Sequence, residues 1–159
     1  MKVIVDTSVW SLALRRSKDV EDKHVEELEE LIKEVRAQLI GPVRQELLNG
    51  IKSEKQYRVL KKHLRAFKDL AMETEDYELA AEYFNTARKN GIQGSNTDFL
   101  LCAISTRHRM PIFTTDKISV HYQDKYPDLA EFISEHGWET LGVYDAAPVE
   151  HHKRLRTTN

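Results

Sequence analysis

Met1-Lys2-Val3-Ile4-Val5-Asp6-Thr7-Ser8-Val9-Trp10 is the stretch of sequence that decides the fold. Its apolar run of β-branched residues predicts a short buried strand that ends on the carboxylate of Asp6. Thr7 and Ser8 are both good helix N-caps, and the apolar residues that follow predict a helix. In open α/β sheets, ligands bind beyond the carboxyl ends of the strands. Asp6 is therefore the first candidate for a functional residue.

The composition predicts one polar-surfaced globular domain. The chain has 159 residues, of which 40% are hydrophobic and 31% charged, and its net charge of −2 neither favours nor excludes a nucleic-acid partner. The single cysteine, Cys102, excludes an internal disulfide and lies in an apolar run, so we expect a small core residue and a reducing, cytoplasmic setting. No apolar run approaches the roughly 20 residues of a membrane span, and no signal-peptide pattern is present.

Short apolar runs alternate with helical patterns along the chain. We predict further strands at Gln38–Ile40 and at 111–115, and a last one near 140–144. Helical patterns lie between them, at 42–49, after Ser53, at 75–89, after Ser95 and around 128–135. This alternation predicts an α/β fold, a three-layer α/β/α sandwich with a central, mainly parallel sheet. We expect one domain over residues 1–149 and a flexible polar tail over 150–159.

Two of the predicted helices have opposite charge. One is a long helix predicted after the polar loop at 15–19. It has an apolar stripe with helical spacing, formed by Leu28, Leu31, Ile32 and Val35, and its other faces are acidic. We interpret those acidic faces as solvated. The helix after Ser53 has a predicted buried stripe formed by Tyr57, Leu60, Leu64 and Phe67. The positions around that stripe are rich in Lys and Arg, in contrast with the rest of the chain.

Four acidic residues share one position relative to the predicted sheet. Asp6 and Asp116 end strands, Glu46 lies early in the helix after the second strand, and Asp98 lies in the first turn of the helix after Ser95. Asp98 or Glu46 alone is explained by helix capping or by the helix dipole, but a strand-ending Asp is less easily explained so, because Thr7 or Ser8 could supply the cap. Together, four carboxylates at one sheet edge repel each other unless a cation neutralises them. Carboxylate oxygens suit Mg²⁺ and Mn²⁺, which favours phosphodiester chemistry.

These residues resemble the four motifs of the PIN-domain ribonucleases, and the size and order resemble the VapC-like toxins of toxin–antitoxin pairs. The motifs are the N-terminal run to Asp6, Pro-Val-Arg-Gln-Glu46-Leu, Thr97-Asp98 and Phe-Thr114-Thr-Asp116. The resemblance covers roughly residues 1 to 120. It departs from a common pattern after the last motif, where many relatives have another Asp two positions on and then an aromatic residue. Here Ile118 and Ser119 stand there.

The resemblance implies an endoribonuclease that depends on Mg²⁺ or Mn²⁺. Asp6, Glu46, Asp98 and Asp116 would form its metal-binding and catalytic quartet. Thr114 would supply a supporting hydroxyl, for which Thr7 is a second candidate. Relatives of this kind form homodimers and are held inactive by a cognate antitoxin, so the expected partners are RNA, an antitoxin and a second copy.

The basic helix is the candidate RNA-binding surface, because Lys and Arg contacts to phosphates position a nucleic acid. The candidates are Lys52, Lys55, Arg58, Lys62 and Arg65. A solvated helix face explains the same residues equally well.

Three other classes of protein remain as alternatives. A phosphatase of the haloacid-dehalogenase type has a second acid two residues after the strand-ending Asp, where this chain has Ser8. A phosphorylatable receiver domain would not need Glu46 and Asp98. A non-catalytic RNA- or protein-binding module on the same fold is the third, and loss of one of the four acids would be its expected sign.

Overall fold

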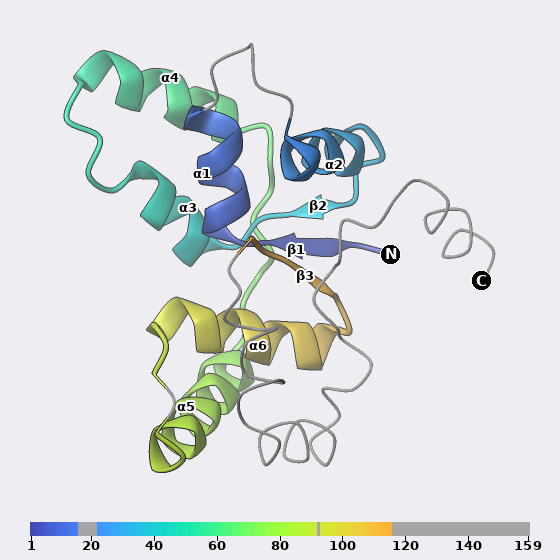
Figure 1. Ribbon diagram of the computed structural model, residues 1–159, viewed down its shortest axis with the longest axis vertical. Coiled ribbons are helices and arrows are strands. Elements are labelled where there is room, and N and C mark those ends of the chain that lie inside the picture. Colours follow the sequence, from blue (N-terminus) through green and yellow to red (C-terminus); the bar gives the residue numbers. More distant parts are fainter. Residues whose placement is uncertain (16–21, 92, 116–159) are drawn as a thin grey trace.

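The computed structural model describes residues 1–15, 22–91 and 93–115 (Figure 1). Within them the elements are β1 (Val3–Val5), α1 (Thr7–Arg15), α2 (Lys23–Lys33), β2 (Ala37–Gln38), α3 (Gly41–Leu48), α4 (Glu54–Leu64), α5 (Thr74–Lys89), α6 (Asn96–His108) and β3 (Ile112–Phe113). Asp116, the predicted helix at 128–135, the predicted strand at 140–144 and the tail at 150–159 lie outside the described residues.

The sheet is parallel, as predicted, with the strand order β2-β1-β3. Ile4 of the central strand is opposite Gln38 on one side and Ile112 on the other. A bridge between Leu39 and Asp69 continues the pairing beyond β2. Helices α1 to α4 lie on one side of the sheet and α5 and α6 on the other, which confirms the α/β/α sandwich (Figure 1).

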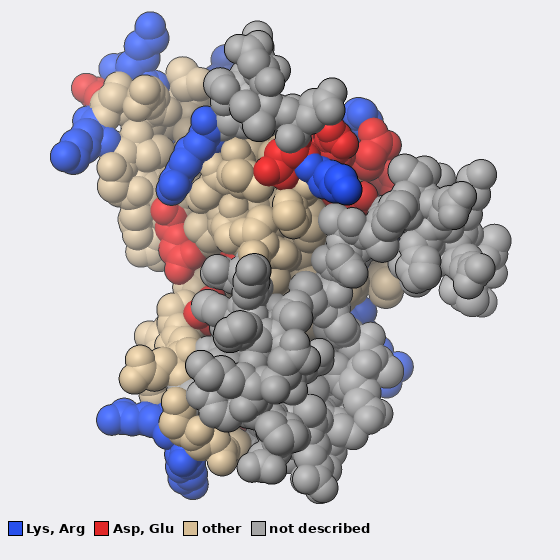
Figure 2. Space-filling model, viewed as in Figure 1, with Lys and Arg blue, Asp and Glu red and all other residues tan. Residues whose placement is uncertain are grey.

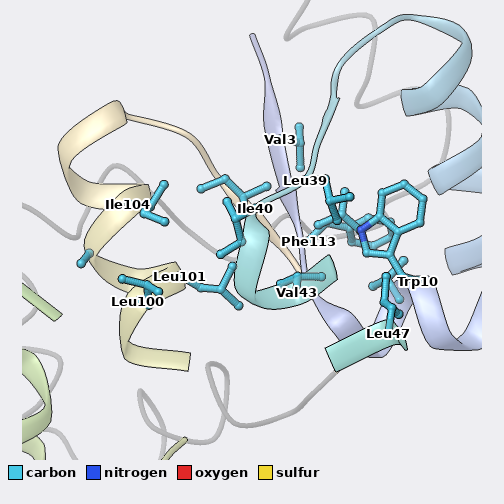
Figure 3. Packing of buried hydrophobic residues seen from close by; sticks show 14 of the residues in the cluster. Val3, Trp10, Leu39, Ile40, Val43, Leu47, Leu100, Leu101, Ile104 and Phe113 are labelled. Atoms are coloured by element: carbon cyan, nitrogen blue, oxygen red, sulfur yellow. The ribbon is translucent and has the colours of Figure 1, made fainter. Parts of the chain in front are cut away.

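The core explains why β1 is a continuous apolar run. All three of its residues are fully buried, because a central parallel strand is covered on both faces. Figure 3 shows side chains of α6, among them Leu101 and Ile104, on one side of the sheet, and Trp10 and Leu47 on the other. The Trp10 ring packs edge-on against Phe67, with 5.0 Å between ring centroids.

Local capping signals place most helix ends where the sequence predicted them. Pro42 lies in the first turn of α3, and Ser53 caps α4 by accepting from the Gln56 amide. Ser95 and Asp98 form a reciprocal capping box at the start of α6. These ends depend on residues within one turn of each other, so the sequence alone predicts them.

The prediction for Val35 is wrong. Leu28 and Leu31 are buried, but Val35 is 73% exposed and adopts φ 57°, beyond the end of α2. The Val35 amide donates to the carbonyl of Ile32 and the Arg36 amide to that of Leu31, at 3.0 and 2.8 Å. This is the helix-ending motif whose left-handed position glycine usually occupies. Because position 35 is a valine and not a glycine, the sequence gives no local indication that the helix ends before it.

A buried carboxylate joins the two helices of the second layer. Asp76 of α5 is fully buried and accepts hydrogen bonds from the Glu73 amide, Arg107 and His108. Burial opposes its ionisation, but the Glu73 amide, the Arg107 guanidinium and the His108 ring together hold the pKa of Asp76 below its usual value. The local sequence does not mark Asp76 as a buried residue, because its partners on α6 are 31 and 32 positions away.

We expect Asp76→Asn to lower the free energy of unfolding at neutral pH by about 2 kcal/mol, because Arg107 and His108 lose a buried anionic partner. A depressed pKa stabilises the folded state above the ordinary carboxyl pKa of about 4, and this contribution is lost as the pH falls through the folded value. Urea unfolding between about pH 7 and about pH 3 should therefore show the deficit shrinking at the acid end. Glu78→Gln, at an exposed acid of the same helix, is the matched control. Equal stabilities of the two variants at neutral pH would contradict this role of Asp76.

Candidate active site

Asp6 lies where β1 ends and α1 begins, with a residue exposure of only 8%. Its Oδ1 accepts a hydrogen bond from the Thr7 amide at 2.7 Å. Its Oδ2 accepts from the hydroxyls of Ser8 and Thr114, each at 2.8 Å. A nearly buried carboxylate needs such donors, because an unpaired buried charge is costly. The donors also hold the carboxylate in one orientation.

The sequence position of Thr7 and Ser8 predicted that their hydroxyls cap α1, but the structure shows that they do not. The helix begins at Thr7, so Asp6 itself occupies the capping position. The Ser8 Oγ lies 3.2 Å from the Thr114 Oγ1 and accepts from the Thr115 amide at 3.1 Å. Ser8 therefore connects Asp6 to the segment that follows β3. Sequence reasoning missed this role, although a hydroxyl two residues after a strand-ending Asp was a usable signal.

Glu46 approaches the site from a different position than predicted. It is the sixth of the eight residues of α3, not an early one, and it is exposed. Thr7 Oγ1 donates to Glu46 Oε2 at 2.5 Å. Because the Thr7 amide also donates to Asp6, one residue holds both carboxylates. The structure thereby brings Glu46 to the edge of the sheet at which Asp6 lies.

Asp98 lies half-buried in the first turn of α6. Its Oδ2 accepts from the Ser95 amide at 2.7 Å, so one of its oxygens closes the capping box. Burial raises the pKa of the Cys102 thiol to about 12, and the charges of Asp98 and Asp6 add to the effect. Both carboxylates therefore lie near one thiol, which stays protonated and unreactive at neutral pH. This agrees with the predicted structural role of Cys102.

Three carboxylates thus lie at the carboxyl edge of the sheet, and within residues 1–15, 22–91 and 93–115 none of them forms an ion pair with Lys or Arg. Asp6 and Asp98 are close enough to act on the same thiol, and Glu46 is joined to Asp6 through Thr7. The described part of the chain contains no group of three or more acidic, His or Cys side chains that could hold a metal ion by itself. Asp116, the fourth predicted acid, directly follows the described Thr115.

The donor set fits a hard divalent cation. All candidate ligands are carboxylate oxygens, and Asp6 is oriented by an amide and two hydroxyls, as ligating carboxylates usually are. With two hydroxyls on Oδ2 and one amide on Oδ1, Asp6 keeps accepting capacity mainly on Oδ1. Mg²⁺ and Mn²⁺ are the ions that such oxygen ligands favour.

A groove of about 810 Å³ lies between α1, α3 and α4, and Glu46 is part of its wall. The groove is lined by Ser11, Leu14, Arg15, Glu46, Leu47, Asn49, Gly50, Ile51, Ser53, Lys55, Gln56, Val59, Leu60 and His63. Its volume is within the range of small-molecule and ligand sites. Glu46 also accepts the Thr7 hydroxyl, so one residue of the groove wall contacts the residue that follows Asp6.

The five predicted RNA-binding residues are all exposed on or beside α4: Lys52, Lys55, Arg58, Lys62 and Arg65. Figure 2 shows Lys and Arg gathered over α4 and Asp and Glu gathered over α2. Lys55 is the member of this set that lines the groove. Arg58 forms an exposed ion pair with Glu54 at 3.2 Å. Of the five predicted RNA-binding residues, Lys55 therefore lies in the groove, and the other four are exposed outside it.

Comparison with known proteins identifies a family and a shared fold. The family described as "PIN domain" matches residues 3–126. No curated protein sequence matches the chain. The fold is similar to that of FitAcB from Neisseria gonorrhoeae, with a TM-score of 0.63 and 19% identity over 91% of this chain and 97% of that one.

Two further solved structures share the fold. VapBC2 from Rickettsia felis, bound to a DNA fragment from its promoter, has a TM-score of 0.58 and 17% identity over 74% of this chain and 89% of that one. A toxin–antitoxin complex from Klebsiella pneumoniae has a TM-score of 0.54 and 13% identity, over 73% and 88%. At these identities the likeness shows the fold alone.

We expect Ser8→Ala and Thr114→Val each to weaken Mn²⁺ binding by about 10-fold, because each removes a hydroxyl that orients Asp6. Titration of the full chain with Mn²⁺, followed by electron paramagnetic resonance, measures the affinity. Thr74→Val, at an exposed hydroxyl that begins α5, is the control. Folded variants with the parental Mn²⁺ affinity would show that the hydroxyls do not support a metal ligand.

Proposed function

This chain belongs to the PIN-domain family, and on that premise we propose that it is an endoribonuclease dependent on Mg²⁺ or Mn²⁺, the toxin of a toxin–antitoxin pair. The observation that carries the proposal is the nearly buried Asp6 carboxylate, which two hydroxyls and an amide orient at the carboxyl edge of the sheet. Glu46 and Asp98 reach the same edge from two other elements. Oriented carboxylates without a Lys or Arg partner among the described residues fit a divalent cation better than a purely structural role.

In this proposal the acidic residues have two roles, metal binding and orientation of the attacking water. Asp6, Asp98 and Asp116 would hold the metal, directly or through water, and Glu46 would complete the set or orient the attacking water. A bound Mg²⁺ or Mn²⁺ ion supplies a more acidic water and neutralises charge that develops on the phosphate. Thr7 donates to Glu46 Oε2, so Oε1 is the oxygen of Glu46 that would accept from the attacking water. In-line attack of water on phosphorus releases the 3′ oxygen, so the products carry a 5′-phosphate and a 3′-hydroxyl.

The substrate would be RNA, gripped through its phosphates by the basic helix. Exposed Lys and Arg of α4 raise the local concentration of a polyanion even though the whole chain is slightly acidic. Contacts of this kind position a nucleic acid without reading its sequence.

A cytoplasmic location would give the protein access to such a substrate. No helix in the described part of the chain is long and apolar enough to cross a membrane.

The proposed partners are an antitoxin and a second copy of the chain. The similar structures from Rickettsia felis and Klebsiella pneumoniae are described as VapBC2 and as a toxin–antitoxin complex. A protein partner of this kind would silence the nuclease by covering the carboxylate edge or its approaches. Exposed apolar residues such as Leu14 and Tyr77, at 47% and 54%, offer contact area for a protein partner.

Membership of a family separates the three alternative classes of protein. Membership of the PIN family decides against a haloacid-dehalogenase phosphatase and against a receiver domain. The non-catalytic binding module stays as the second candidate, since it shares the fold. The presence of all four acids in the sequence favours the enzyme.

We expect the purified chain, freed of any partner, to cut a mixed pool of transfer and ribosomal RNA into discrete fragments with Mg²⁺ or Mn²⁺, and not with chelator. Asp6→Asn should reduce the rate by at least about 100-fold, because it removes the charge that holds the metal. Gel analysis of end-labelled RNA measures the cleavage. Folded protein that leaves RNA intact with either ion would favour the binding module, and cleavage that survives Asp6→Asn would place the active site elsewhere.

Neutralising Lys55, Arg58 and Lys62 together should flatten the dependence of RNA affinity on salt. Each lost phosphate contact lowers the slope of log affinity against log salt by about 0.7 for a single strand. Filter binding of a labelled RNA at several salt concentrations measures the slope. Neutralising the exposed Lys2, Lys23 and Lys89 instead changes the net charge equally and should leave the slope nearer that of the parent. An unchanged slope in the first variant would leave α4 as a solvated face.

A further inference from the structure

Helix α3 carries Glu46, but the helix by itself does little to fix where that side chain lies. It has only eight residues, and Ile40 at its capping position has no polar side chain. Isolated helices shorter than about 12 residues are marginal in water, so the orientation of α3 depends on its neighbours. Those neighbours include α1 and α4 (Figure 1). The contacts of α3 with the rest of the fold therefore decide where Glu46 lies.

Arg44, two residues before Glu46, binds the end of α4 and the segment that follows it. Its Nε donates to Asp69 Oδ1 and Oδ2 at 3.0 and 2.9 Å, and its Nη2 donates to Asp69 Oδ1 at 2.8 Å. Nη1 donates to the Leu64 carbonyl at 2.9 Å, and Nη2 donates to the Phe67 carbonyl at 2.6 Å. Leu64 is the last residue of α4, so Arg44 satisfies a carbonyl that has no partner within its own helix. All three nitrogens of the guanidinium group are thus engaged.

The segment that Arg44 binds is itself attached to the sheet. Asp69 forms a bridge with Leu39, which continues the pairing beyond β2. The Gln38 side chain of β2 donates to the Lys68 carbonyl at 3.1 Å. Arg44 therefore connects α3 to a part of the chain whose place is set by the sheet, and not to a free loop.

Arg44 and Glu46 lie on opposite sides of the buried face of α3. Val43 and Leu47 form that face and are 0% and 7% exposed. Successive helical residues are about 100° apart, so Arg44 and Glu46 are separated by about 160° around the helix axis. Glu46 contacts Thr7 on one side of the buried face, and Arg44 contacts the segment after α4 on the other. Apolar contacts are not directional, so the bonds of Arg44 are what resist a rotation of α3 that would move Glu46 away from Thr7.

We propose that Arg44 is a positioning residue of the proposed active site, which holds α3 in the orientation that brings Glu46 to Thr7. The inference rests on the proposed function and adds to it the group that sets the place of Glu46. Arg44 is not an RNA contact, because its side chain is only 22% exposed and its nitrogens are engaged within the fold. A lysine could not replace it, since an ammonium group lacks the planar fork that binds Asp69 and two carbonyls together.

The test compares three substitutions in the full chain. Arg44→Lys keeps the charge and removes the fork, and Asp69→Asn weakens the same contact from its other partner. Arg88→Lys, at an exposed arginine of α5, is the matched control. Each substitution is made with and without Glu46→Gln, and circular dichroism melting identifies the variants that fold. Asp69→Asn carries the test if Arg44→Lys does not fold.

We expect Arg44→Lys to lower kcat for RNA cleavage with Mn²⁺ by about 10-fold and to leave KM within about 2-fold, because a displaced Glu46 affects the reaction and not the binding of RNA. Asp69→Asn should act in the same direction, and Arg88→Lys should change neither constant. When Glu46→Gln is present, Arg44→Lys should lower kcat by no more than about a further 2-fold, because the group that it positions is already lost. Equal losses with and without Glu46→Gln would overturn the proposal, since Arg44 would then act independently of Glu46.

A second readout does not depend on catalysis. The Thr7 amide donates to Asp6 and the Thr7 hydroxyl donates to Glu46, so the ¹H–¹⁵N signal of Thr7 reports on both contacts. In spectra recorded without metal, we expect Arg44→Lys to shift this signal in the same direction as Glu46→Gln. Arg88→Lys should leave it in place. An unshifted Thr7 signal in a folded Arg44→Lys chain would overturn the positioning role.

The two readouts separate this inference from the proposed function. If the unmodified chain cleaves no RNA with Mg²⁺ or Mn²⁺, the proposed function fails, and the Thr7 signal alone decides whether Arg44 positions Glu46. If the unmodified chain cleaves RNA, and Arg44→Lys changes neither kcat nor the Thr7 signal, the nuclease proposal stands and the positioning role is wrong.

Discussion

The hydrogen bonds to the Asp6 carboxylate are the interaction on which the carboxyl edge of the sheet depends. A charged group at 8% exposure is stable in the fold only when donors replace the water it has lost. Its donors are the Thr7 amide, the Ser8 hydroxyl and the Thr114 hydroxyl, so β1, α1 and the end of β3 meet at one side chain. Asp6 therefore connects three segments of the fold through hydrogen bonds, and its negative charge favours a bound cation.

The second layer of helices supports this edge from a distance. Asp98 is placed by the start of α6, and α6 is tied to α5 by the buried Asp76, which pairs with Arg107 at the other end of α6. The helix that presents a candidate metal ligand is thus anchored at its far end by an ion pair. Removing one partner of such a pair leaves a charge in a largely buried place, which is why its loss is expected to be costly.

Where the sequence prediction failed, the missing information was tertiary. Val35 fits the apolar spacing of α2, but α2 stops before it, and only the hydrogen bonds of the helix end show this. Glu46 was expected near the start of its helix, yet the sixth residue of α3 reaches the site because α3 packs against α1. Thr7 and Ser8 have the sequence position of helix caps. In the structure the Thr7 hydroxyl donates instead to Glu46 of α3, and the Ser8 hydroxyl donates to Asp6.

The sequence by itself determined the order of strands and helices, the parallel sheet, most helix ends and the family, because these depend on residues close together in the chain. It also predicted Asp6, Glu46, Asp98 and Asp116 as one set, through their positions at strand ends and near helix starts, and the family resemblance added Thr114. Only the tertiary structure decided which hydroxyls orient Asp6, that Thr7 joins it to Glu46, and that Asp76 is buried between α5 and α6. It alone formed the groove, since a groove is the space between helices whose packing no local pattern encodes.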